Sequence, residues 1–182
     1  MKKHFVLLFT LVFALAFSVK GQSASLMIPD DLEGEPGLTV LVPVYLTNTV
    51  PFCNIDLYIG FDSNVLTFQG IVDSQLPGNT FANTLPGSDS EILINWFALE
   101  GQTLDGLLLY VQFMYHGGET DINFLTELIE IIDCTPAGND ISFTVANGFI
   151  GPVPPIPLSN WAIFLGLGLI VGLVVLRMTK VI

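Results

Sequence analysis

Basic side chains are absent from the middle of this chain. Of its 182 residues, five are Lys or Arg, and all five lie within the first 20 or the last six positions. All 17 Asp and Glu residues lie between Asp30 and Asp140. Proteins that bind nucleic acid neutralise phosphates with Lys and Arg. The composition therefore excludes nucleic acid as a partner of the central part, and core packing and hydrogen bonds must stabilise its fold.

Histidine is almost as scarce, which argues against catalysis. His4 lies in a segment expected to be removed, and His116 stands alone before a Gly-Gly pair. One His and two Cys cannot supply the usual zinc ligands, and neither a Gly-rich phosphate loop nor an Asp-rich calcium loop is present. Paired carboxylates could act as in glycosidases, but no pocket that would raise one pKa is evident. We expect no catalytic residue, no metal site and no cofactor.

The chain contains two cysteines, Cys53 and Cys134. In an exported domain, a pair of cysteines favours a disulfide. Such a bridge would join the start of one expected strand to the end of a late one. The alternative is two buried free thiols, since Cys also packs as a small apolar residue.

The two ends of the chain predict export and anchoring. Residues 1–21 have a basic start, a short apolar run and small residues after it, as in a secretory signal peptide. Residues 158–176 are uncharged and long enough for one transmembrane helix, and the tail at 177–182 is basic. The Pro-rich segment 151–157 is expected to be a stiff linker. A single domain at 22–150 would then face outwards from a bacterial membrane or cell surface.

A nine-residue stretch from Cys53 to Phe61 shows the clearest pattern of the domain. Its odd positions are apolar, whereas its even positions are polar, small or amphipathic. This period of two is typical of a strand with one face in a core and the other in water. Asn54, Asp56 and Tyr58 are expected side by side on the outer face.

Further strands are expected every 8–12 residues, which predicts an all-β fold, a single jelly-roll β-sandwich of about nine strands. In the strand at 92–98, Trp96 is expected to point into the core, whereas Asn95, Phe97 and Leu99 point outwards. The other expected segments are strands at 40–46, 65–72, 107–115, 121–125, 128–133 and 141–150, a lead-in at 22–37, an irregular connection at 73–91 and a turn at 99–106. Pro43 suggests an edge strand or a bulge.

The stretch C-N-I-D-L-Y-I-G-F-D-S-N-V-L at 53–66 also resembles a strand of the cohesin modules of cellulose-degrading assemblies, of the form N-x-D-(apolar)-x-x-x-Y-D-P-x-V-L. Two positions depart from this form: Phe61 replaces Tyr and Ser63 replaces Pro. V-L-V-P-V-Y-L-T-N at 40–48, D-G-L-L-L-Y-V-Q-F at 105–113 and V-A-N-G-F-I at 145–150 extend the likeness. The resemblance covers about residues 37–151 and implies a nine-stranded jelly-roll sandwich.

The resemblance also implies a function. Cohesins bind dockerin modules, which carry calcium, and so display enzymes of polysaccharide degradation on scaffolds or cells. Asn54 and Asp56 match polar positions that contact dockerin in the family. Phe97, Leu99 and Glu100 match its contact region approximately, and Tyr58 is added here from the alternation. The expected function is therefore a membrane-anchored, non-enzymatic binding module that recruits a dockerin-type protein.

Two alternatives stay open. Carbohydrate-binding modules share this sandwich, so the domain could bind a polysaccharide directly, although only Tyr58 and Phe97 can be placed on outer faces as sugar platforms. A purely structural surface protein is the other alternative, because a fold alone does not determine function.

The segment before the predicted membrane helix resembles the C-terminal sorting signals of the exosortase type. These signals combine a short motif, one transmembrane helix and a basic tail. The motif here is I-P-L-S-N-W, with Pro157, Leu158, Ser159 and Trp161 as its expected residues. The alternative is a plain single-span anchor.

Overall fold

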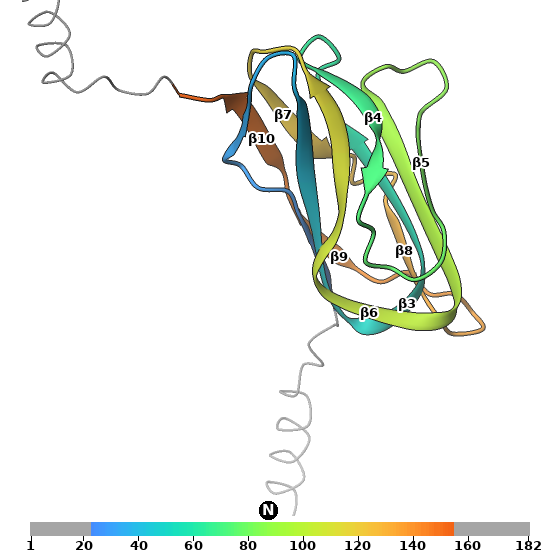
Figure 1. Cartoon of the computed structure of the whole chain (residues 1–182). Helices are drawn as coiled ribbons and strands as arrows, with labels where there is room; N and C mark the ends of the chain where they lie inside the picture. The colour runs from blue at the N-terminus through green and yellow to red at the C-terminus, as the bar shows by residue number, and fades with distance from the viewer. Residues whose placement is uncertain (1–22, 155–182) are drawn as a thin grey trace, which may run out of the picture. The chain divides into compact units, whose positions relative to one another are not determined.

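The structure is a computed structural model that describes residues 23–154 (Figure 1). This part of the chain contains ten β-strands and no helix. The strands are β1 (Ala24–Met27), β2 (Leu32–Gly34), β3 (Thr39–Gly60), β4 (Leu66–Val72), β5 (Thr80–Thr84), β6 (Glu91–Tyr115), β7 (Thr120–Phe124), β8 (Glu130–Asp133), β9 (Phe143–Ala146) and β10 (Gly148–Pro152). The expected all-β class is confirmed.

Two long strands, β3 and β6, organise the fold. They pair antiparallel from Thr39 opposite Met114 to Gly60 opposite Glu91. The register shifts between Asn48 and Phe52, where the paired strands bend, and Figure 1 shows β6 curving at this end of the molecule. Because each strand continues past the bend, β3 and β6 each contribute one half to either side of the sandwich.

The halves of β3 and β6 recruit different neighbours. Layer A consists of β9, β1, the first half of β3, the second half of β6, and β4. Layer B consists of β5, the first half of β6 and the second half of β3, which pairs with both β8 and β7. Strands β10 and β2 continue layer B from β7. The curled sheet thus encloses the core between two layers, as expected for a β-sandwich.

The core lies between the inward faces of both layers. Along the second half of β3, the odd-numbered side chains from Ile55 to Ile59 are almost completely buried. Trp96 of β6 is fully buried, packs edge-on against Phe52 with ring centroids 5.4 Å apart, and donates an Nε1 hydrogen bond to the carbonyl of Pro77 at 2.8 Å. The expected alternation and the core position of Trp96 are confirmed.

Four local expectations were wrong. The expected last strand at 141–150 is two strands, β9 and β10, which pair with β1 and with β7 respectively. The expected turn at 99–106 belongs to the continuous strand β6. The connection at 73–91 contains β5, and the lead-in at 22–37 contains β1 and β2. These short strands form because distant strands pair with them: β1 lies between β3 and β9, β5 pairs with β6, and β2 pairs with β10. Turn-forming residues in the sequence could not report such long-range pairing.

Pro43 lies next to a bulge, as one of its two readings predicted. It pairs with Tyr110 of β6, and the register shifts between Val44 and Tyr45. The pairing of β3 with β1 starts at Tyr45. Because Pro43 lies outside the segment paired with β1, its missing N–H breaks no bond to that strand.

The expected end segments are mostly outside the described residues. Strand β10 extends to Pro152, two residues into the expected linker. Within residues 23–154, no helix is long and apolar enough to cross a membrane. The signal peptide at 1–21, the helix at 158–176, the tail at 177–182 and the sorting motif of Pro157, Leu158, Ser159 and Trp161 stay predictions.

A candidate protein-binding face

The outer face of layer B carries most of the residues selected from the sequence. In the second half of β3, Asn54, Asp56 and Tyr58 are half-buried while the side chains between them are buried. This alternation places the three side chains on one outer face, within about 14 Å along the strand. Within the sheet, this part of β3 lies between β6 and β8.

Neighbouring strands add further residues to this face. Register places Phe97 and Ile132 on either side of Asn54, and Asn95 and Glu130 on either side of Asp56. Phe81 of β5 lies opposite Asn95, on the side of Asn95 that faces away from Asp56. The outer face of layer B is defined here by Asn54, Asp56, Tyr58, Phe81, Leu93, Asn95, Phe97, Glu130 and Ile132.

The centre of this face is polar. The side-chain Nδ2 of Asn95 donates a short hydrogen bond to Oδ1 of Asp56. This bond joins β6 to β3 across the outer face and holds the Asp56 carboxylate in a fixed orientation. A fixed carboxylate is a preorganised acceptor for donors of a partner, because less side-chain entropy is lost when it binds.

Two exposed aromatic side chains, on β6 and β5, border the polar centre on one side. Phe97 is 63% exposed and Phe81 is 57% exposed. Leu93 lies opposite Tyr58 on the adjacent strand and is half-buried. Exposed aromatics around hydrogen-bonding groups are typical of the centre of a protein interface. The surface can therefore combine apolar contacts with directed hydrogen bonds.

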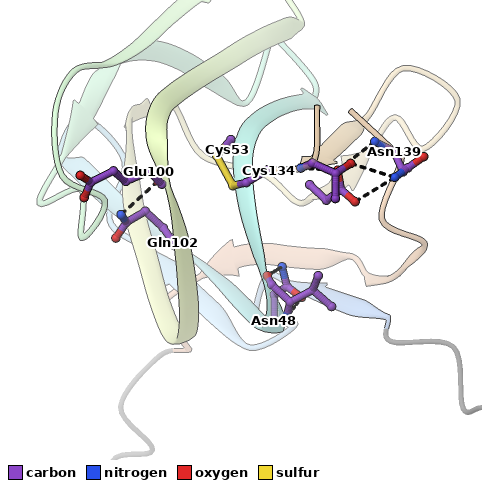
Figure 2. Close-up of a disulfide and its surroundings, with 9 residues drawn as sticks. Asn48, Cys53, Glu100, Gln102, Cys134 and Asn139 are labelled. Carbon is purple, nitrogen blue, oxygen red and sulfur yellow. Dashed lines mark hydrogen bonds between the residues drawn. A yellow bond between two sulfur atoms is a disulfide. The ribbon is translucent and has the colours of Figure 1, made fainter. Parts of the chain in front are cut away.

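Leu99 and Glu100 lie at the end of this face, where β6 reaches the bend. Leu99 is completely exposed, and the backbone carbonyl of Glu100 accepts a hydrogen bond from Nε2 of Gln102 at 3.2 Å (Figure 2). Both residues follow Phe97 along the strand but lie beyond its pairing with Asn54. The structure therefore brings Phe97 into contact range of the polar centre and leaves Leu99 and Glu100 at the margin.

A disulfide lies directly beside the face. Cys53 and Cys134 are bonded, with Cα atoms 5.1 Å apart and 81 positions apart in sequence (Figure 2). The predicted bridge is confirmed. Cys53 precedes Asn54, and Cys134 follows β8, so the bond fastens β8 to β3 at one end of the face. Gly101 allows β6 to approach, because a Cβ there would lie 2.9 Å from Sγ of Cys134.

The turn after β8 is ordered by one carboxylate. Oδ1 of Asp133 accepts hydrogen bonds from the backbone N–H of Thr135 and of Asn139 and from the Thr135 hydroxyl, at 3.0, 2.9 and 2.7 Å. Oδ2 accepts a fourth from Nδ2 of Asn139 at 3.1 Å. These hydrogen bonds lower the pKa of Asp133 to about 2. The bond from the Thr135 hydroxyl contributes most, and the bonds from Asn139 add to it. Figure 2 shows this turn beside the disulfide.

Sequence reasoning missed part of this face. Asn95 follows from the alternation around Trp96, but Phe81, Leu93, Glu130 and Ile132 were not selected. Phe81 lies in a segment expected to be irregular, and Ile132 reaches the face only because β8 pairs with β3. For Leu93, the same alternation that placed Phe97 outside was a sufficient signal.

Metal-binding and basic groups do not cluster in the described part of the chain. Within residues 23–154, no group of three or more His, Cys, Asp or Glu side chains is placed to hold a metal ion. The ring Nε2 of His116 shares a hydrogen bond of 2.8 Å with the Thr67 hydroxyl, away from the outer face of layer B. The hydrogen-bonding and apolar side chains on the outer face of layer B are suited to binding a partner by direct contact.

The fold is that of cohesin modules. A cohesin from the archaeon Archaeoglobus fulgidus, described as non-cellulosomal, is 22% identical, with a TM-score of 0.60 over 72% of this chain and 92% of the other. The seventh type I cohesin of ScaB from Pseudobacteroides cellulosolvens is 17% identical, with a TM-score of 0.61 over 76% and 97%. The third cohesin of ScaC from Acetivibrio cellulolyticus, solved in complex with the ScaB dockerin, is 16% identical, with a TM-score of 0.62 over 72% and 99%.

No protein-family model matches the sequence, and no curated protein matches it either. The likeness to the solved structures is one of fold, and at this level it confirms the resemblance that the sequence motifs indicated.

Proposed function

We propose that this chain is a binding module that recruits a dockerin-type protein through the outer face of layer B. The observation that carries the proposal is the composition of that face: a polar centre of Asn54, Asp56 and Asn95 lies beside the exposed Phe97, opposite Asn54, and the exposed Phe81, opposite Asn95. The fold supports it, since several solved cohesins of this fold were determined in complex with dockerins.

The charge of the domain supports a particular kind of partner. Between residues 21 and 176 the chain has no Lys or Arg, so no carboxylate of this segment pairs with a Lys or Arg of its own segment, and a partner can supply these groups. Asp56 and Glu130 lie next to each other across β3 and β8 and form the acidic part of the face. A partner with Lys, Arg, Ser or Thr at the contact would supply the matching donors.

The proposal includes calcium on the side of the partner. Dockerin modules of the resembling family are calcium-loaded, whereas the described part of this chain has no cluster suited to a metal ion. Removal of calcium should therefore unfold the partner and abolish binding, and it should leave the stability of this domain unchanged.

The proposed location follows from the ends of the sequence. A signal peptide at 1–21 and a membrane helix at 158–176 would place the domain outside the cell on a short linker, anchored in a bacterial membrane or passed to a sorting enzyme. A recruited partner would then be held at the surface. We propose a role in polysaccharide degradation, because the resembling cohesins display enzymes of that kind.

A pull-down tests the proposal. The full chain, solubilised from membranes and immobilised, is exposed to culture supernatant of the source cells with calcium or with a calcium chelator, and bound proteins are identified by mass spectrometry. We expect a protein with a dockerin-type module in the calcium sample and its absence in the chelator sample. Capture of the same proteins in both samples, or of none with such a module, would contradict the proposal.

Direct binding of a polysaccharide is the second candidate. Phe81 is an exposed aromatic that the sequence did not place, and an open pocket of about 450 Å³ lies beside it, lined also by Asp73 and Asn79. Exposed aromatics can stack on sugar rings. Retention of the chain by an insoluble neutral polysaccharide, unchanged by the chelator and lost in Phe81→Ala, would favour this candidate over a dockerin-type partner.

A further inference from the structure

An open pocket of about 450 Å³ lies where the chain passes from β4 to β5. This volume is within the range of about 300–1,000 Å³ that is usual for ligand pockets. In the described part of the chain, β4 and β5 each pair with β6 and with no other strand, so both are edge strands. Leu76 of the connection is 6% exposed and lines the pocket together with Phe81. The pocket therefore has an apolar wall that continues into the core.

Hydrogen bonds hold this connection in place. Nε1 of Trp96 donates to the carbonyl of Pro77, and the backbone N–H of Gln75 donates to a carbonyl of β6, both at 2.8 Å. The hydroxyls of Ser74 and Thr80 share a further hydrogen bond of 2.9 Å across the connection. A pocket whose walls are fixed before binding loses little conformational entropy when a ligand binds. The pocket is therefore preorganised.

The backbone of Asp73 has an uncommon conformation beside the pocket. Its φ is 54°, and among the described residues no other non-glycine residue has a positive φ. Aspartate tolerates this left-handed conformation better than most residues, although it adopts it infrequently. Such conformations are concentrated at functional sites, where the surrounding structure maintains them. At Asp73 the turn follows the end of β4 and places an exposed carboxylate among the groups that line the pocket.

The side chains that line the pocket match the two kinds of surface on a sugar. Phe81 is 57% exposed, and the negative face of an aromatic ring attracts the C–H groups of a pyranose. The Asp73 carboxylate accepts hydrogen bonds from hydroxyls, and the Asn79 amide both donates and accepts. Asp73 is the only ionisable group among the lining residues, and no Lys or Arg lies between residues 21 and 176. An anionic sugar would be repelled, so the ligand that fits is a neutral saccharide.

Phe81 also belongs to the outer face of layer B, where it lies opposite Asn95. We propose that the pocket binds one unit of a neutral saccharide, and that the saccharide and the protein partner compete for Phe81. A ring that is covered by a sugar is not available to the partner, so each ligand lowers the affinity of the chain for the other. Thermodynamic linkage requires that both affinities fall by the same factor. The competition rests on the proposed function, whereas the saccharide site does not depend on it.

Retention by insoluble polysaccharides tests the saccharide site. The full chain, solubilised in a mild detergent, is mixed with cellulose, unsubstituted xylan, mannan or chitin, and with cross-linked polygalacturonate as an anionic control. We expect retention by at least one neutral polysaccharide and none by polygalacturonate. Asp73→Gly, which suits a φ of 54°, and Asn79→Ala should each keep the melting transition of the parent and reduce retention about tenfold.

A matched control removes a carboxylate elsewhere. Asp89→Gly changes an exposed aspartate in the turn between β5 and β6 and should be retained like the parent. If no neutral polysaccharide retains the parent, or if both pocket variants are retained like Asp89→Gly, the pocket binds no saccharide.

A soluble oligosaccharide of the retaining polysaccharide tests the competition. At saturation it should raise the dissociation constant of the captured partner about tenfold, and the partner should raise that of the oligosaccharide by the same factor. In Asp73→Gly the oligosaccharide should leave partner binding unchanged. If both ligands bind the parent and neither affects the other, they do not compete for Phe81. If a polysaccharide retains the chain but no partner is captured, the proposed function and the competition are wrong, and the saccharide site stands.

Discussion

Asp56 is the residue on which the proposed binding depends most. Its carboxylate lies at the centre of the outer face of layer B and is oriented by Asn95. Asn54 lies two positions earlier on the same strand face. Both side chains are half-buried. A partner that covers them would remove them from water, and it would have to replace the hydrogen bonds that they make with water.

Asp56→Ala and Asn54→Ala should each weaken binding of the captured partner by about 1–3 kcal/mol, as loss of a hydrogen-bonding side chain at the centre of an interface does. The dissociation constant, measured by titration calorimetry, reports the loss. Ser25→Ala, an exposed serine of layer A, should bind like the parent. If all three variants bind like the parent, the binding surface lies elsewhere.

Asp133 is expected to make the β8 turn sensitive to acid. Hydrogen bonds from Thr135 and Asn139 lower the pKa of Asp133 to about 2, below its ordinary value of 3.8. The contribution of this carboxylate to stability is therefore fully present above pH 4 and is lost as the pH falls towards 2. The melting temperature of the parent should fall more steeply between pH 4 and 2 than that of Asp133→Asn. Equal slopes for the two proteins would contradict this account.

Individual residues were predictable where strand alternation determines their direction. Asn54, Asp56 and Tyr58 were placed on an outer face, and Trp96 in the core, because a period of two fixes which side a residue faces. Phe81 and Ile132 were not predictable in this way. Their positions depend on which distant strands β5 and β8 pair with, and the local sequence of a short strand does not determine its pairing partner.

At the scale of elements, the two long strands are what the sequence described least well. Residues 99–106 were expected to form a turn. In the structure β6 continues through it, because β3 bends at the same place and supplies hydrogen bonds on both sides of the bend. Gly106 has a φ of 142°, which a glycine adopts readily. This glycine therefore allows β6 to curve, and the chain does not reverse direction there.

The disulfide should contribute strongly to the stability of this bend. Closing a loop across 81 positions lowers the entropy of the unfolded chain, which is worth about 4 kcal/mol in the chain-entropy model. The double variant Cys53→Ala/Cys134→Ala should therefore melt at least about 5 °C below the parent in calorimetry. A thiol reducing agent should lower the melting temperature of the parent and leave that of the double variant unchanged. A parent that is insensitive to reduction would contradict this role.

At the scale of the whole molecule, one-sided charge is the dominant property. The domain has 17 acidic residues and no Lys or Arg, and its nearest basic residues are Lys20 and Arg177 at the ends of the chain. Charges of one sign repel each other in the compact state. The sequence predicted this property completely, because it depends on composition and not on how the strands pair.

Salt should therefore stabilise the protein. Raising sodium chloride from low concentration to about 1 M shortens the screening length to about 3 Å and weakens the repulsion among carboxylates. The melting temperature at pH 7 should rise with salt, and the rise should be smaller near pH 4, where many carboxylates are protonated. Potassium chloride serves as a control for a specific effect of sodium. A melting temperature that falls with either salt would show that repulsion does not limit stability.

The most direct measurement of the central claim is a contact map between this chain and its captured partner. A photoreactive phenylalanine analogue replaces Phe97 on the outer face of layer B in one full-length variant and Met27 on the outer face of layer A in another. Irradiation with the partner present should give a cross-linked product at position 97, and this product should disappear when calcium is chelated. At position 27 we expect no cross-link to the partner. A calcium-dependent cross-link at position 27 and none at position 97 would contradict the claim that the partner binds the outer face of layer B.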